Sequence, residues 1–491
     1  MMIPILFFTI CVGALAAFFI RDDNSRRRLL VAAALLHIVL TVFAWFDDTT
    51  YVFGLFGVDS LSRWFLTVTS FLFCAAAFYA KGYLKRQSHA RQKDFEENLL
   101  FLDAPEPVFT GCLLLFLSCM TLAIFCRHFG MLWAAMEATT LATAPLIYFH
   151  RHHRSLEAVW KYLLICSVGI ALALLGNLFL AAALKAEGGS GAQLFFRDLT
   201  SPSVHWNSAW LKAAFIFFLV GYGTKMGLSP MHTWLPDAHS EAPSVVSALL
   251  SGALLNCAFL AILRIHQVCV AAGLGVFSSQ LLILFGLISM VTAAVFIVGQ
   301  TDYKRMLAYS SIEHMGILAL GAGLGPIAYF AVLLHILNHS FTKAALFFTA
   351  GNILGRYQTK EIAKVSGVLQ ELPVSGFLWL CGFLAITGMP PFGLFISEFL
   401  ILKAGFDSGH IFAMIVYLAA LAVIFMAMAY TFLNMAQGKS RLQPKASQPE
   451  ARSAVLPALA LCAVVFILGF YIPPQINDFL HKAAVSMEAP R

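Results

Sequence analysis

The residues of this chain that could do chemistry are ionisable side chains inside long apolar stretches. The candidates of this kind are Glu137, Lys225, His335, His339, Lys343 and Glu398. A charge at membrane depth costs about 3 kcal/mol on insertion scales, so such residues are seldom kept there without a function. Carboxylate, ammonium and imidazole groups all bind and release protons. These residues therefore indicate transport of protons or cations rather than catalysis of a reaction.

Lys225 follows an apolar segment and precedes Gly227 and Pro230, two residues that interrupt helices. Interrupted backbone at membrane depth is tolerated only where it is buried in protein or lines a water-filled cavity. A buried ammonium beside a broken helix is typical of an ion path. Glu137, in the middle of another apolar segment, is the candidate counter-charge, because its approach or departure would load or unload the lysine. A purely structural ion pair is the alternative interpretation.

The spacing of His335, His339 and Lys343 (i, i+4, i+8) predicts that their side chains share one face of a helix. A single buried histidine is usually a hydrogen-bonded core residue, but three aligned titratable groups are harder to explain in that way. Histidine suits proton transfer because it titrates near neutral pH. The pattern favours a proton relay, and ligation of a haem or metal is the alternative.

A second broken helix is predicted at Pro390 and Pro391, and Glu398 follows it as the acidic end of the same path. Paired interruptions in the two halves of a chain indicate a transport site built from a repeat. Further candidates for the path lie beside the first break and in the helix that starts near residue 306. They are His232, Asp237, His239, Glu313 and His314.

The composition of the chain is that of an integral membrane protein. Of 491 residues, 60% are hydrophobic and 12% charged, with a mean hydropathy of +0.81, whereas soluble proteins have about 25% charged residues. Apolar stretches of about 20 residues predict an all-α fold with fourteen transmembrane helices. These begin near residues 2, 29, 60, 108, 129, 156, 209, 242, 279, 306, 326, 374, 411 and 454. Residues 1–20 lack a basic leader and are read as a spanning helix, not a signal peptide.

The distribution of Lys and Arg predicts the orientation. When the loops are assigned alternately to two sides, one side holds most of the basic residues, in loops such as 21–28, 81–93 and 439–452. Basic loops stay inside, so both termini are expected outside a bacterial or archaeal inner membrane. Scattered basic residues do not indicate nucleic-acid binding. The ten cysteines have no C-x-x-C pair and are read as small apolar side chains. Glu157 and Lys161, at i and i+4, are expected to form a local salt bridge.

Four motifs, in this order, resemble the antiporter-like subunits of respiratory complex I and its relatives. They are residues 234–243, 307–316, 335–343 and 388–398, and residues 59–62 add a weaker likeness. The resemblance extends over roughly residues 50–440. Within that family, residues 310–316 and 251–257 are most similar to the hydrogenase-4 component F branch.

The resemblance implies two inverted five-helix repeats, each with a broken helix. The expected divisions are 1–107 for three N-terminal helices, 108–263 and 264–436 for the two repeats, and 437–491 for a loop and the last helix. It also implies roles. Glu137 and Lys225 would be the ion pair of the first half-channel, the residues at 335, 339 and 343 a central axis, and Glu398 the end of the second half-channel. Asn256 stands where many relatives have lysine. An amide cannot take up a proton, so water would carry the proton there.

The function implied is a proton-translocating membrane subunit of an energy-converting oxidoreductase, of hydrogenase-4, formate hydrogenlyase or complex I type. We expect no redox or hydrolytic site in this chain, and [NiFe] and iron–sulfur centres in partner subunits. Two alternatives stay open: a Na⁺/H⁺ antiporter subunit, and a membrane subunit of a non-redox inorganic-carbon uptake complex.

Overall fold

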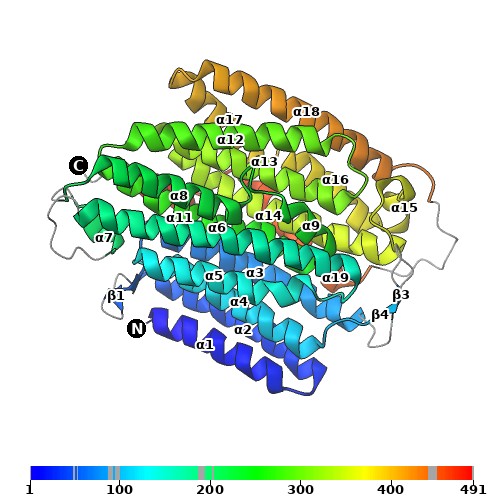
Figure 1. Ribbon diagram of the computed structural model, residues 1–491. Helices are drawn as coiled ribbons and strands as arrows, with labels where there is room; N and C mark the ends of the chain where they lie inside the picture. The colour runs from blue at the N-terminus through cyan, green and yellow to red at the C-terminus, as the bar shows by residue number, and fades with distance from the viewer. Residues whose placement is uncertain are drawn as a thin grey trace.

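The computed structural model describes residues 2–47, 50–51, 54–86, 92–93, 100–185, 194–201, 204–440 and 450–488. Long helices make up most of it and run side by side along one common direction (Figure 1). No water reaches backbone groups in a bilayer, so apolar segments satisfy their N–H and C=O groups within helices. The all-α prediction is confirmed in its main lines. Parts of the basic loops 81–93 and 439–452 lie outside the described residues.

The helices up to the first break follow the chain in order. They are α1 (Met2–Phe19), α2 (Asp23–Ala44), α3 (Ser60–Arg86), α4 (Glu106–Phe125), α5 (Phe129–Ile147), α6 (His153–Lys185), α7 (Phe196–Leu199) and α8 (Ser208–Met226). Two short antiparallel strand pairs, which the sequence did not predict, connect some of them. They are β1 (Thr50–Tyr51) with β2 (Phe56–Gly57), and β3 (Gln92–Lys93) with β4 (Leu100–Phe101).

The remaining helices follow the first break. They are α9 (Trp234–Glu241), α10 (Ser244–Leu249), the π-helix η1 (Leu250–Leu254), α11 (Leu255–Ala271), α12 (Gly275–Ile297), α13 (Tyr303–Gly323), α14 (Pro326–Tyr357), the 3₁₀ turn η2 (Ile362–Lys364), α15 (Val368–Glu371), α16 (Pro373–Ile386), α17 (Gly393–Asp407), α18 (Ile411–Ala436), α19 (Arg452–Leu468) and α20 (Pro474–Val485). Each predicted apolar stretch overlaps a helix. Within the described residues, eight helical stretches are long and apolar enough to cross a membrane, and three further apolar helices are shorter.

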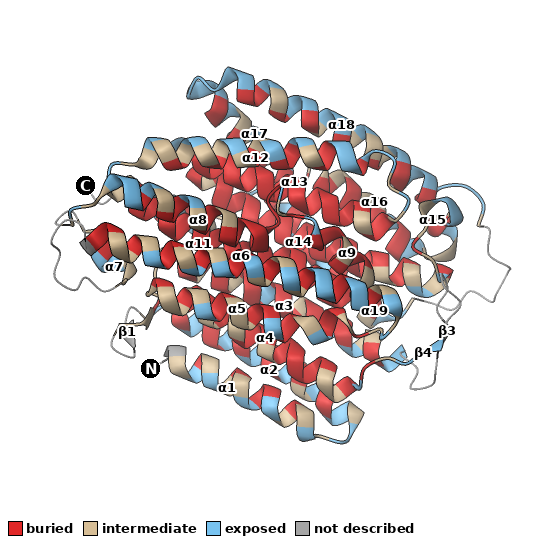
Figure 2. Cartoon of the chain, viewed as in Figure 1, coloured by how far each residue is buried: buried red, intermediate tan, exposed pale blue. Residues whose placement is uncertain are grey.

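Burial increases toward the middle of the bundle (Figure 2). The most apolar part of α14 is 94% buried, and that of the continuous segment Ser244–Ala271 is fully buried. Outer helices instead expose large apolar side chains, such as Phe8 on α1 and Phe412 on α18. Such faces suit lipid tails, so the polar residues of the inner helices are kept away from the hydrocarbon.

Glycines allow two pairs of helices to approach closely. A Cβ atom on Gly221 of α8 would lie 2.6 Å from the carbonyl oxygen of Gly169 on α6. Gly286 of α12 and Gly316 of α13 face each other, and a Cβ on either would lie 2.7 Å from the other's carbonyl oxygen. Small residues at such contacts increase van der Waals packing, the main attraction between helices in lipid.

Asp59 connects α3 to two distant segments. Its carboxylate accepts hydrogen bonds from both terminal nitrogens of Arg264 on α11, at 2.6 and 2.8 Å, and one from Arg127 at 2.9 Å. It also accepts from the backbone N–H of Ser62 at 2.8 Å, which caps α3. The Arg264 guanidinium is buried and stacks over the ring of Phe196. The carboxylate thus neutralises a buried cation.

Asp59→Ala is expected to lower stability by about 3–5 kcal/mol, because it leaves the buried Arg264 without its counter-charge. The measurement is thermal unfolding of the purified protein in detergent. The matched control is Asp407→Ala, which removes an exposed pair with Lys403 (2.8 Å) on α17 and should cost less than about 1 kcal/mol. Equal losses of stability in the two variants would contradict the assignment.

Candidate functional site

The first break separates α8 from α9. Gly227 directly after α8 has φ +82°, a left-handed conformation that glycine adopts without strain. The free carbonyl groups at the end of α8 have partners. The indole N–H of Trp234 donates to the Thr224 oxygen at 2.8 Å, and the Leu228 N–H donates to the Gly223 oxygen at 2.8 Å. The break is therefore a defined structure and fixes the last turn of α8.

Lys225 lies in that last turn and is fully buried. Its ammonium donates to the Thr140 hydroxyl at 2.6 Å and to the Tyr162 hydroxyl at 2.8 Å, and it lies 4.9 Å from the centre of the Tyr162 ring. A helix C-terminus carries a partial negative charge, which favours a cation. Hydroxyls, an aromatic ring and a helix end together stabilise the buried charge.

Glu137 is connected to Lys225 through Thr140. The Thr140 hydroxyl, which accepts from the lysine, donates to one carboxylate oxygen at 3.3 Å, and the Ser167 hydroxyl donates to the other at 3.2 Å. Among the described residues, no ion pair within 4.0 Å joins Glu137 to Lys225. The ion pair implied by the family resemblance is thus indirect in this structure, with one hydroxyl between the two charges.

The central residues of α14 lie on the face toward α13. Lys343 donates to the Leu307 carbonyl at 2.8 Å and to the Ser310 hydroxyl, both on α13. The ring of His339 lies 5.0 Å from that of His314, also on α13. His335, His339 and Lys343 are all fully buried. The spacing prediction of one shared face agrees with these contacts.

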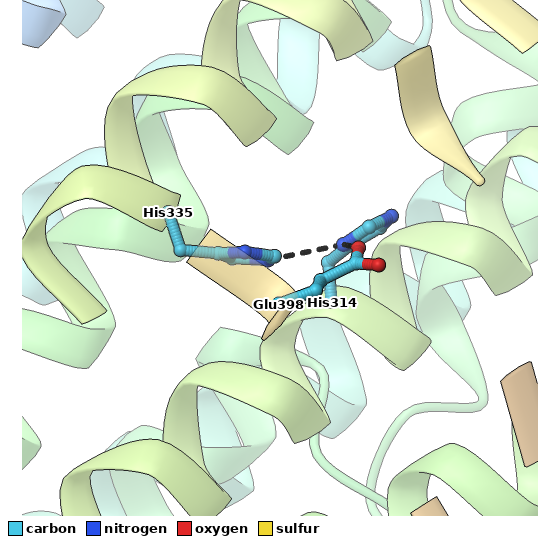
Figure 3. Close-up of side chains that lie close together, drawn as sticks. All are labelled: His314, His335 and Glu398. Carbon is cyan, nitrogen blue, oxygen red and sulfur yellow. Dashed lines mark hydrogen bonds and ion pairs between the residues drawn. The ribbon is translucent and has the colours of Figure 1, made fainter. Parts of the chain in front are cut away.

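The second break, between α16 and α17, places Glu398 beside two histidines (Figure 3). His314 Nδ1 and His335 Nε2 are 3.1 Å apart, and Glu398 Oε1 lies 3.9 Å from His314 Nδ1. Gly388 in the break has φ +62°, and a Cβ there would lie 1.9 Å from Glu398 Oε2. Only glycine at this position leaves room for the carboxylate. The contact between the two histidines was not predicted, although both were candidates.

Several buried polar atoms near these residues make no hydrogen bond to any described residue. They are both ring nitrogens of His239 and His339, both amide atoms of Asn338, Oδ1 of Asn256, Oε2 of Glu313 and Oε1 of Glu398. Buried polar groups are normally paired, and groups that ordered water can bridge are the usual exception. Asn338 was not among the predicted residues, and its only signal in the sequence is its position one turn from His335. A Cβ on Gly393, at the start of α17, would lie 2.5 Å from the amide oxygen of Asn338.

Asn256 contacts the central helix directly. It follows the π-helix η1, and its amide donates to the Gly252 carbonyl at 2.8 Å and to the Ser340 hydroxyl on α14 at 2.7 Å. Ser340 is the neighbour of His339 in the chain. Single π-helical turns occur frequently at functional sites. The structure thus brings Asn256 into contact with α14, next to His339.

Two of the further candidates, Asp237 and His232, have partners on helices other than α14. Asp237 pairs with Lys161 at 2.9 Å and with Arg305, which gives it structural partners. Lys161 also pairs with Glu157 at 2.6 Å, so the predicted local salt bridge is confirmed. His232 lies beside the stacked rings of Phe296 on α12 and Tyr309 on α13, and its Nδ1 has no hydrogen-bond partner among the described residues. His239, in contrast, is fully buried and stacks at 5.1 Å on a phenylalanine of α14, one turn after Lys343.

Known proteins share both the sequence and the fold of this chain. Residues 126–425 match the family described as NADH:quinone oxidoreductase/Mrp antiporter, transmembrane. A hydrogenase-4 component F homolog of Methylacidiphilum infernorum is 38% identical over 436 residues, which are 88% of this chain and 89% of that protein. A chain of the Mrp complex from Dietzia sp. DQ12-45-1b has a TM-score of 0.82 at 20% identity, covering 98% of this chain and 97% of its own. A chain of respiratory complex I from Thermus thermophilus has a TM-score of 0.81 at 21% identity, covering 99% of each.

Gly388→Ala is expected to destabilise the protein by about 2–4 kcal/mol, from the left-handed backbone and from the clash with the Glu398 carboxylate. Gly409→Ala is the matched control, since Gly409 has φ +79° and nothing within 4 Å of the added Cβ. It should cost only about 1–2 kcal/mol. Thermal unfolding of both variants measures the difference, and a control as unstable as Gly388→Ala would refute the role of the clash.

Proposed function

Because the chain belongs to the NADH:quinone oxidoreductase/Mrp antiporter family of membrane proteins, we propose that it is a proton-translocating membrane subunit of an energy-converting oxidoreductase complex. The similarity to a hydrogenase-4 component F homolog favours the hydrogenase type. The observation that supports the proposal best is the series of buried ionisable groups on the innermost helices, many with polar atoms that lack a partner among the described residues.

The proposed path begins at Glu137 and Lys225. The shared Thr140 hydroxyl provides the first hydrogen-bonded link. From there the proton moves past Asn256 to the axis of His339 and Lys343, with water bridging the unpaired polar atoms. Each transfer only exchanges the donor and acceptor roles of neighbouring groups, so no covalent chemistry is needed.

The path ends at the second break. The pair His314 and His335 accepts the proton from the axis, and Glu398 is the terminal group. Glu313, buried on the same helix as His314, is a further member, and His239 lies beside the axis on the side of the first break. The proposed path does not include Asp237, which is held in ion pairs with Lys161 and Arg305. It does not include His232 either, which packs beside the rings of Phe296 and Tyr309.

The proposed architecture has fourteen spans. Residues 108–263 and 264–436 form two inverted five-helix repeats, whose broken helices are α8–α9 and α16–α17, while 1–107 and 437–491 add the flanking helices. Each break has a glycine with positive φ and an ionisable residue nearby, Lys225 or Glu398, which supports the repeat. The N and C marks of Figure 1 lie at the same end of the bundle, which suits an even number of spans with both termini outside.

Partner subunits complete the proposed complex. The structurally similar chains come from multi-subunit complexes, and we assign the [NiFe] and iron–sulfur centres to partner chains. A Na⁺/H⁺ antiporter is the competing function. Na⁺ is a hard cation and prefers oxygen ligands, whereas the axis consists of imidazole and ammonium groups. Mass spectrometry of the intact complex identifies the partners and also tests for a non-redox carbon-uptake assembly.

Lys225→Ala is expected to reduce proton translocation by at least about tenfold, because it removes a positioned proton carrier, while the complex still assembles. The measurement is ΔpH formation by the reconstituted complex in proteoliposomes. The control is Lys212→Ala on the same helix, where the side chain is exposed, and this variant should pump like the wild type. Retained ΔpH formation in Lys225→Ala would falsify the proposed path.

The two substitutions at Asn256 should rank in a defined order. Asn256→Leu removes the bond to Ser340 and leaves nothing for water to bind, so translocation should fall sharply. Asn256→Lys provides the group that many relatives have and should be tolerated, although a new buried charge costs a few kcal/mol unless it is hydrated. The same ΔpH assay measures both variants. The reverse ranking would mean that the proton does not pass this position.

A further inference from the structure

Three ligand-type side chains converge between α13, α14 and α17. The ligand atoms of His314, His335 and Glu398 all lie within 4.8 Å of one another, and the three side chains are buried (Figure 3). Two imidazoles and one carboxylate with a fourth position left open form a donor set of known zinc sites. His314, His335 and Glu398 provide these donors. Two further observations concern the orientation of their ligand atoms.

The first observation concerns the ring nitrogens that point away from the cluster. His314 Nε2 lies 3.0 Å from the Ile386 carbonyl, which can only accept, so Nε2 bears the proton. His335 Nδ1 lies 3.0 Å from the Ser397 hydroxyl, whose own hydrogen is donated to the Leu394 carbonyl at 2.9 Å. The Ser397 hydroxyl can thus accept a hydrogen from His335 Nδ1, which is the tautomer that leaves His335 Nε2 free to bind a metal ion. Metal-binding histidines are held by such outer hydrogen bonds to oxygen.

The inner nitrogens, His314 Nδ1 and His335 Nε2, are 3.1 Å apart. Because His314 carries its hydrogen on Nε2, its Nδ1 presents a lone pair to this contact. His335 Nε2 either donates a hydrogen to that lone pair or, when His335 carries its hydrogen on Nδ1, presents a second lone pair, and the two nitrogens can then bind one metal ion. Two ligands at about 2.0 Å from a tetrahedral Zn²⁺ are about 3.3 Å apart, close to the observed separation.

The second observation concerns the carboxylate. Glu398 Oε1 has no hydrogen-bond partner among the described residues and lies 3.9 Å from His314 Nδ1. Two ligands of a tetrahedral Zn²⁺ lie about 3.3 Å apart, so this unpaired oxygen would have to move by less than about 1 Å to become a ligand. Met389 and Pro390 in the adjacent break are exposed.

We propose that His314, His335 and Glu398 form a binding site for a divalent first-row transition-metal ion of borderline softness, with Zn²⁺ as the preferred ion. Ser397 and the Ile386 carbonyl position the two imidazoles. The ion would occupy the end of the proposed proton path, so it would stop translocation. That consequence rests on the proposed function, whereas binding itself does not.

The test measures Zn²⁺ bound to the purified complex without turnover. The complex is freed of metal with a chelator, equilibrated with micromolar Zn²⁺ and desalted, and its zinc content is compared between variants. The wild type should retain one more Zn²⁺ per copy of this chain than His335→Gln or Glu398→Gln. The matched control is His266→Gln, which alters a buried histidine bonded to Ser278 outside the cluster and should bind zinc like the wild type.

The positioning role of Ser397 is tested by a separate measurement. Ser397→Ala should weaken zinc binding by about 10–100-fold, as loss of an outer hydrogen bond does in metal sites, without removing a ligand. Co²⁺ in the wild type should give the intense visible absorption of a tetrahedral ion, and this band should be lost in Glu398→Gln. Equal zinc content in wild type and both ligand variants, or an octahedral Co²⁺ spectrum, would overturn the site. In that case the 3.1 Å contact is a hydrogen bond between the two rings.

Discussion

The cost of placing charge in hydrocarbon is the constraint on which this structure depends. An unpaired ionised group that faces lipid is costly. Lys225 on α8, Lys343 on α14 and Glu398 on α17 are accordingly buried, and Glu137 on α5 is partly buried. The outer helices expose phenylalanine, leucine and valine instead. The buried interior is mainly apolar, and these polar groups lie within it.

Burial also determines how each charge is stabilised. Lys225 and Lys343 donate to hydroxyls and backbone carbonyls, not directly to carboxylates. Neutral oxygen partners stabilise an ammonium without fixing it in a tight ion pair. A lysine held in this way can respond to a carboxylate that moves, and Thr140 lies between Lys225 and Glu137 in the position for such a response. Asp59 and Arg264 are the contrasting case, since their bidentate pairing suits a permanent structural contact.

The two helix breaks give the inner helices their polar geometry. In each break a glycine with positive φ turns the chain, and a neighbouring side chain occupies the space that a Cβ would fill. At Gly388 this side chain is Glu398 itself, so backbone conformation and carboxylate position depend on each other. The carboxylate then meets the histidines of α13 and α14, and one small cluster joins three helices.

The sequence by itself determined the membrane class, the positions of the main helices, the two breaks and the shared face of His335, His339 and Lys343. These features are local, because helix formation in lipid, interruption by Gly and Pro, and the i, i+4 spacing depend on neighbours along the chain.

Only the tertiary structure decided which groups meet. The hydroxyls of Thr140 and Tyr162 at Lys225, the contact of His314 with His335, and Asn338 beside Gly393 all join different helices. It also gave Asp237 two ion-pair partners, Lys161 and Arg305. Such contacts depend on how helices distant in the sequence pack, and the apolar surfaces that direct this packing look alike in composition from one helix to the next.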